Sequence, residues 1–203
     1  SDRYVVNSQL KFHGFDESSL ITILAEEDSL IDEDKIISEI KKNKDSLSLV
    51  LLPGIQYYSG QVIDLKKISE ACKENKITLG LDLAHMIGNV AINLSSYDVD
   101  FASWCSYKYL NSGPGGIAGI YVNSKHLKND LLRLEGWWGN KLSSRFEMLD
   151  KYDPEPSAEG WVLSNPPVIL MDIHLASLEV FTAAGLDNVF KKSLTKSSPP
   201  NAL

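Results

Sequence analysis

The chain has 203 residues, of which 43% are hydrophobic and 23% are charged, and it carries a formal net charge of −7 at pH 7. This composition is typical of a soluble globular chain that can bury a hydrophobic core. The acidic balance, with no basic cluster longer than KKNK at 41–44, excludes the electropositive surface that binds nucleic acid or an anionic membrane.

The start of the chain, SDRYVVNSQLKF, lacks the basic and apolar segments of an export signal, and no apolar run reaches membrane-spanning length. Cys72 and Cys105 show neither CxxC nor any metal-binding spacing, which favours two reduced thiols. We therefore expect a cytoplasmic protein without a metal site.

Strand-like and helix-like segments alternate along the first part of the chain. LITILAEE at 20–27 is typical of a strand, and DEDKIISEIKKN at 32–43 has the apolar spacing of a helix behind an acidic first turn. SLSLVLLPG at 46–54 is typical of a buried strand. A second unit repeats this order, with a helix over 65–76 after Asp64 and the strand ITLGLDL after it.

A third unit follows in the same order. AHMIGNVAINL at 84–94 predicts a helix and a turn, VDFASWC at 99–105 a buried strand, and GGIAGIYV at 115–122 a further strand. The alternation predicts an α/β fold with a mainly parallel sheet, helices on both faces and ligands at the carboxyl ends of the strands. We expect one partial large domain over 1–185, then a terminal helix and polar tail over 186–203.

Polar groups follow two of the predicted strands. Asp82 ends the strand ITLGLDL, His85 comes three residues later, and Lys108 follows VDFASWC. A carboxylate and an amine in one crevice suit pyridoxal phosphate, because the lysine forms a Schiff base and the carboxylate keeps the pyridine nitrogen protonated. Each residue alone also fits a structural role, Asp82 as a helix cap and Lys108 as a solvated turn residue. NSGPGG after Lys108 lacks a nucleotide-binding spacing and is interpreted as a turn.

Six motifs carry a resemblance to one family over roughly residues 45–182. They are LLPGIQYYSGQ, LDLAHMIGNV, VDFASWCSYKYLNSGPGGIAGIYV, LEGWWGN, SSRFEM and LSNPP, in this order. Together they resemble kynureninase, a pyridoxal-phosphate enzyme of fold type I. The resemblance implies an aminotransferase-like large domain and a homodimer. It also implies hydrolysis of L-kynurenine or 3-hydroxy-L-kynurenine to anthranilate or 3-hydroxyanthranilate plus L-alanine, in tryptophan catabolism and NAD biosynthesis.

The resemblance also implies roles for the residues at the strand ends. Lys108 matches the Schiff-base lysine, Asp82 the partner of the pyridinium and His85 a cofactor contact. Tyr107 matches a tyrosine that reaches the cofactor phosphate and takes part in proton transfer, a role that a phenol can fill. Relatives can carry serine where this chain has Pro53, which offers neither a hydroxyl nor an N–H group.

Two further matches are implied to act across the dimer interface. Trp137 in LEGWWGN matches a cofactor-site tryptophan, and Asn165 in LSNPP matches a residue near the substrate ring and cofactor. Ser164 borders the same pocket. Without the resemblance, the Trp-Trp pair fits packing in a core or interface, and an Asn before Pro-Pro fits a turn.

Parts of the family pattern have no match in this chain. We expect the amino-terminal segment that binds the cofactor phosphate and stacks on its ring to be absent, together with the small carboxyl-terminal domain that binds the substrate carboxylate. Two alternatives therefore stay open: a truncated, noncatalytic α/β protein, or another fold-type-I enzyme such as a desulfurase or aminotransferase. The motifs LEGWWGN and LSNPP argue against the second.

Overall fold

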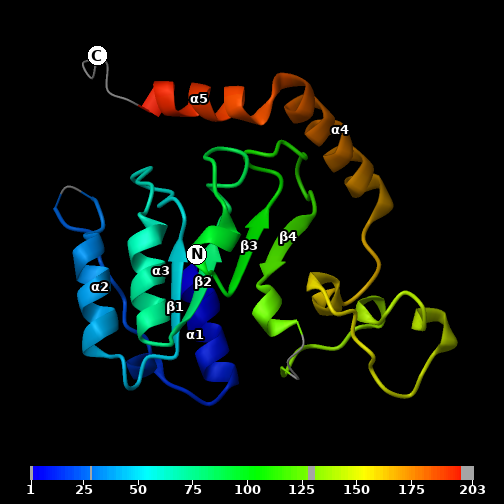
Figure 1. Ribbon diagram of the computed structural model, residues 1–203, viewed down its shortest axis with the longest axis horizontal. Coiled ribbons are helices and arrows are strands. Elements are labelled where there is room, and N and C mark those ends of the chain that lie inside the picture. Colours follow the sequence, from blue (N-terminus) through cyan, green and yellow to red (C-terminus); the bar gives the residue numbers. More distant parts are fainter. Residues whose placement is uncertain (1, 28, 128–130, 198–203) are drawn as a thin grey trace.

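The computed structural model describes residues 2–27, 29–127 and 131–197, and a four-stranded sheet lies at its centre (Figure 1). The strands stand in the order of the sequence. They are β1 (Leu49–Pro53), β2 (Thr78–Asp82), β3 (Phe101–Cys105) and β4 (Ala118–Val122). The first three are parallel, and β4 is antiparallel to β3. The predicted mainly parallel α/β sheet is therefore confirmed.

Two amphipathic helices pack against one face of this sheet, as their apolar spacing predicts. Helix α2 (Glu33–Lys42) is capped by the Asp32 side chain, and α3 (Leu65–Glu74) by Asp64, which accepts hydrogen bonds from the first amides of the helix. The buried positions include Ile36 and Ile40 of α2 and Ile68 and Cys72 of α3. These side chains form one core with the strands.

The two faces of the sheet differ in exposure. On the face toward the core, Val50, Leu79, Leu81 and Ala102 are buried. On the other face, apolar side chains from β1, β3 and β4 are exposed: Leu49 (42%), Leu51 (38%), Phe101 (38%) and Ile120 (42%). The segment VDFASWC thus forms the predicted strand, but it is buried on one face only.

The strand predicted at 20–27 is wrong. No residue of this segment pairs with the sheet, in which β1 is an edge strand. Ile23 packs against the core while Ile21 and Leu24 are exposed, so this apolar segment contributes to packing without pairing as a strand.

The helix predicted within 84–94 is also absent from the described structure. Residues 84–89 form successive turns, and a short 3-10 helix (Leu94–Tyr97) follows. Gly88 has a φ of +80°, a left-handed conformation that ends helical turns, and a Cβ at this position would lie 3.1 Å from the Tyr109 backbone. The chain therefore turns toward β3 after a single helical turn.

Helix α1 (Asp2–Phe12) buries no side chain. Two further helices form the C-terminal end of the described chain. Helices α4 (Val168–Ala184) and α5 (Leu186–Ser197) meet at Gly185, where the predicted break occurs, and arch over the end of the sheet (Figure 1). The polar tail predicted at the C-terminus lies beyond residue 197, outside the described residues.

In the described part of the chain, no single helix has the length and apolar composition needed to cross a membrane. Helices α4 and α5 pass that test only as a pair, and they are bent by 79° at their junction.

A buried carboxylate links the amino end of β3 to its neighbours. The Asp100 side chain accepts a hydrogen bond from the Leu79 amide at 2.7 Å and lies 2.8 Å from Lys125 Nζ and 2.6 Å from His126 Nε2. Burial alone would raise the pKa of Asp100, but the hydrogen bonds from Lys125, Leu79 and His126 outweigh it and lower the pKa below its usual value.

Asp100→Asn should lower the free energy of unfolding at neutral pH by roughly 1–3 kcal/mol, because the hydrogen bonds to a charged acceptor weaken. Since the pKa of Asp100 is lower in the folded chain, its contribution is complete above the ordinary value of 3.8 and is lost as the pH falls through the folded-state value. Urea unfolding at neutral pH and below about pH 4 measures both effects. Asp45→Asn, at an exposed position, is the control, and an equal loss in both variants would contradict the prediction.

Candidate active site

The parallel pairing of β2 and β3 brings the predicted polar residues to one edge of the sheet. Asp82, the last residue of β2, is in register with Ser103, and Lys108 follows β3 by three residues. Pro53 ends β1 in register with Asp82. The predicted convergence of the two strand ends is therefore present in the structure.

One oxygen of the Asp82 carboxylate is hydrogen-bonded to the backbone. Its Oδ1 accepts a hydrogen bond from the Ala84 amide at 2.8 Å, so it caps the turn that replaces the expected helix. Among the described residues, Oδ2 accepts no hydrogen bond. One oxygen thus fixes the carboxylate, and the other stays available at the carboxyl end of β2.

His85 lies between two tyrosine rings, with the centroids of Tyr57 and Tyr109 each 6.0 Å from its own. Burial lowers the pKa of His85, and the positive charge of Lys108 lowers it further, while Asp82 and Asp2 act in the opposite direction. His85 is therefore biased toward the neutral imidazole, and its pKa depends on both residues of the predicted pair.

Lys108 lies in a loop whose shape is set by two buried hydroxyls. Ser106 and Ser112 are hydrogen-bonded to each other, and Ser106 also bonds to the Ile117 carbonyl. A Cβ at Gly116 would lie 2.1 Å from Ser112 Oγ, so only glycine leaves room for this pair. This explains the glycine cluster after Lys108, which forms the predicted turn. Among the described residues, Lys108 Nζ has no ion-pair partner and lies 5.6 Å from the centroid of the Tyr107 ring.

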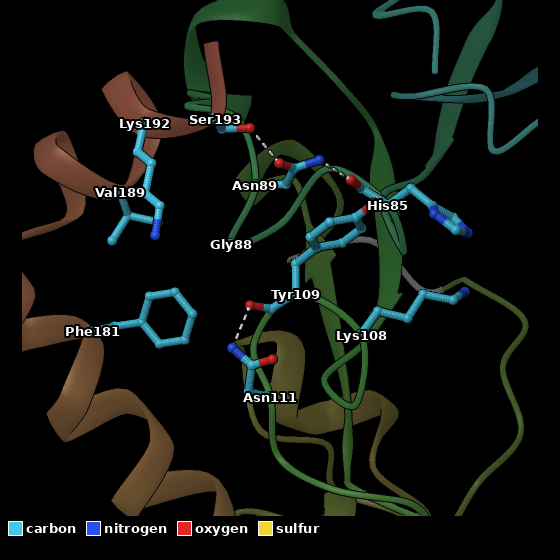
Figure 2. Close-up of a pocket in the computed structure, with 10 residues that line it drawn as sticks. All are labelled: His85, Gly88, Asn89, Lys108, Tyr109, Asn111, Phe181, Val189, Lys192 and Ser193. Atoms are coloured by element: carbon cyan, nitrogen blue, oxygen red, sulfur yellow. Dashed lines mark hydrogen bonds between the residues drawn. The ribbon is translucent and has the colours of Figure 1, made fainter. Parts of the chain in front are cut away.

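A cavity of about 650 Å³ lies between these loops and the C-terminal helices. Its lining residues are His85, Gly88, Asn89, Lys108, Tyr109, Asn111, Phe181, Val189, Lys192 and Ser193. In Figure 2 the Tyr109 ring stands between the Phe181 side of the cavity and the ends of the Lys108 and His85 side chains. The Lys108 and His85 side chains therefore point away from α4 and α5.

Trp137 and Asn165 are not among these lining residues and belong to a different part of the chain. A Cβ at Gly136 would lie within 2.6 Å of the Leu163 backbone, so the segments around Trp137 and Asn165 are packed against each other. Trp137 is 39% exposed and donates its indole N–H to the Arg145 carbonyl at 2.9 Å. Asn165 is exposed and accepts a hydrogen bond from Ser164.

Sequence reasoning missed several residues that shape this site. Ser106, Ser112, Tyr57 and Tyr109 give no signal by themselves, because serines and tyrosines are common in loops. The only available hint was the position of Ser106 beside Tyr107 and Lys108.

The chain is similar to known proteins in both sequence and fold. A family model described as aminotransferase class-V matches residues 15–139. The chain belongs to this family. Its curated relatives include kynureninases, 45% identical over 199 residues in Pyricularia oryzae and 47% identical over 201 residues in Debaryomyces hansenii. The resemblance recognised from the motifs is thus confirmed.

The chain spans less than half the length of these relatives. The matches cover 96% of this chain, but 40% of the Pyricularia oryzae protein and 44% of the Debaryomyces hansenii protein. Solved structures agree in fold. A cysteine desulfurase from Thermococcus onnurineus has a TM-score of 0.66 at 18% identity, with 93% of this chain and 45% of that chain covered. A ureidoglycine-glyoxylate aminotransferase from Bacillus subtilis has a TM-score of 0.56 at 20% identity, with 79% and 40% covered.

Lys108→Met should raise the pKa of His85 toward its ordinary value of 6.5, because the variant removes a positive charge near the imidazole. Titration of the histidine ring signals by NMR measures this pKa, with His85→Gln to assign the signal. Lys192→Met, which changes a lysine on the α5 side of the cavity, should leave the pKa unchanged. Equal shifts in both variants would refute a specific influence of Lys108.

Proposed function

We propose that this chain carries part of the active site of a kynureninase. Such an enzyme uses pyridoxal phosphate to hydrolyse L-kynurenine or 3-hydroxy-L-kynurenine to anthranilate or 3-hydroxyanthranilate and L-alanine. The observation that carries the proposal is the placement of Asp82, His85 and Lys108 at two adjacent parallel strand ends, in a chain 45% identical to a kynureninase. We also propose a cytoplasmic location, which the two free cysteines fit.

The residues present fit the ring end of this cofactor. Pyridoxal phosphate supplies a ring that accepts the negative charge developing on the substrate carbon. The oxygen of Asp82 that accepts no hydrogen bond from the described residues can receive one from a pyridinium N–H. Lys108 Nζ, which has no ion-pair partner among those residues, would hold the cofactor through its aldehyde group.

The chain's own groups also account for proton movement in the proposed reaction. The Lys108 amine would remove and return a proton at the α-carbon of a bound substrate. Tyr107 is 49% exposed beside Lys108, so its phenol can exchange protons with a bound substrate. His85, biased toward the neutral form, can accept a hydrogen bond without adding charge to the site.

We further propose a homodimer in which Trp137 and Asn165 serve the active site of the partner copy. Helix α4 begins at Val168 and meets the Lys108 loop at Ser177, which corresponds to about 14 Å along the helix axis. This spacing supports the proposal, because it separates Asn165 from Lys108 of the same chain. For Trp137 to fill this role, its indole N–H would have to release the Arg145 carbonyl and donate a hydrogen bond to the cofactor phosphate.

Lys108 should be the main site at which pyridoxal phosphate attaches to the chain. Mixing the two, reducing with borohydride and locating pyridoxyl-lysine by mass spectrometry should give saturable labelling at Lys108. Lys108→Arg should abolish that labelling, whereas Lys192→Arg should not. Asp82→Asn keeps the cap on Ala84 but should raise the half-labelling concentration by roughly tenfold to hundredfold, because a charged acceptor is lost. Labelling scattered over surface lysines would contradict the proposal.

Two complementary variants test the homodimer. Trp137→Ala should label weakly at its own Lys108, because each site lacks the partner's indole, and Lys108→Ala cannot be labelled at that position. A mixture should restore labelling at Lys108 of the Trp137→Ala chain, since Lys108→Ala supplies the intact Trp137. Leu132→Ala, at an exposed position, replaces Trp137→Ala in a control mixture. No gain over the unmixed Trp137→Ala chain would count against the shared site.

A further inference from the structure

The C-terminal helices are hydrogen-bonded to both loops that carry the proposed catalytic residues. In α4, Ser177 Oγ donates to the carbonyl of Leu110, two residues after Lys108. This bond joins residues 67 positions apart in the sequence. It ties α4 directly to the Lys108 loop.

A second link runs from α5 to the turn that carries His85. Ser193 Oγ donates to Oδ1 of Asn89 at 2.6 Å, and Asn89 Nδ2 donates to the His85 carbonyl at 3.2 Å. Figure 2 shows this chain of bonds running from α5 through Asn89 to the His85 backbone. Here the bonded side chains are 104 positions apart.

Other hydroxyls on the same two helices behave differently. Thr182 Oγ1 donates to the Leu178 carbonyl within α4 at 2.9 Å, and Thr195 Oγ1 to the Lys191 carbonyl within α5 at 2.8 Å. Such bonds within a helix are the usual local choice for serine and threonine. Ser177 and Ser193 bond across to the loops.

The two links matter because α4 packs loosely on the rest of the chain. Helix α4 has no buried residue along its whole length. Phe181 and Val189 face the cavity from these helices, and neither is buried. Directional bonds at Leu110 and Asn89 therefore supply much of what relates the helices to the loops.

We propose that Ser177 and Ser193 are positioning residues that fix the Lys108 loop and the His85 turn relative to each other through α4 and α5. Neither hydroxyl touches the reacting atoms. Ser177 acts through the Leu110 carbonyl, and Ser193 acts through the Asn89 side chain, which is bonded to the His85 carbonyl. The catalytic meaning of this arrangement rests on the proposed function, whereas the positioning itself is a property of the chain without cofactor.

Amide hydrogen exchange of the chain without cofactor tests the positioning. Ser177→Ala should speed exchange in residues 106–113, and Ser193→Ala in residues 83–90, each by roughly threefold to tenfold for the loss of one hydrogen bond. Ser177→Thr and Ser193→Thr should restore slow exchange, because the hydroxyl is kept. Thr182→Ala and Thr195→Ala, which remove hydroxyls bonded within the helices, should leave both loops unchanged. Unchanged loops in the serine variants, or equal effects in the threonine controls, would overturn the proposal.

Bound cofactor gives a second readout. The pH midpoint of the absorption change of chain-bound pyridoxal phosphate should shift in Ser177→Ala and Ser193→Ala and return in the threonine variants, because the surroundings of Lys108 change. A normal midpoint in the alanine variants would also refute the proposal. If the unaltered chain is not labelled at Lys108, the proposed function fails, while the exchange rates still decide whether the serines position the loops.

Discussion

The parallel pairing of β2 with β3 is the constraint on which the site depends. Gly80 faces Phe101 in this pair, and a Cβ at Gly80 would lie 2.3 Å from the Phe101 ring, so the close approach requires glycine. At the amino end of the pair, the Asp100 carboxylate accepts a hydrogen bond from the Leu79 amide. With that end fixed, the register places Asp82 beside Ser103. The segments that follow β2 and β3 then bring His85 and Lys108 to the same edge of the sheet.

The site needs more than this register, because Lys108 lies beyond the last residue of β3. The loop that carries it is closed by the amide of Ser112, which donates to the Ser106 carbonyl at 3.1 Å, and by the hydrogen bond between their side chains. Both serines are essentially inaccessible to solvent. The Ser106 hydroxyl also donates to the Ile117 carbonyl, which gives this buried pair a further hydrogen-bond partner. The loop is therefore ordered from inside while Lys108 remains partly exposed.

The sequence correctly predicted the elements that are determined by interactions between residues close to each other in the chain. Helices α2 and α3 follow from apolar spacing and from the aspartates that cap them, and Lys108 follows from its place after an apolar strand. The strand at 20–27 was predicted wrongly because an apolar segment can pack against the core without a strand partner. The helix within 84–94 was predicted wrongly because the left-handed Gly88 ends the turn. The contacts of Ser177 and Ser193 join residues far apart in sequence, so no local pattern could reveal them.

The division of the motifs between two places follows from the same geometry. The close contact of Gly136 with Leu163 holds Trp137 and Asn165 in one unit, which the ion pair of Lys141 with Asp153 at 2.7 Å also braces. Helix α4 leaves this unit and reaches the Lys108 loop only at its middle. Because a helix is stiff over such a length, it acts as a spacer between the two groups of motif residues. A rearrangement that joined them within one chain would have to break α4 or its hydrogen bond to Leu110, whereas the association of two copies would leave both intact.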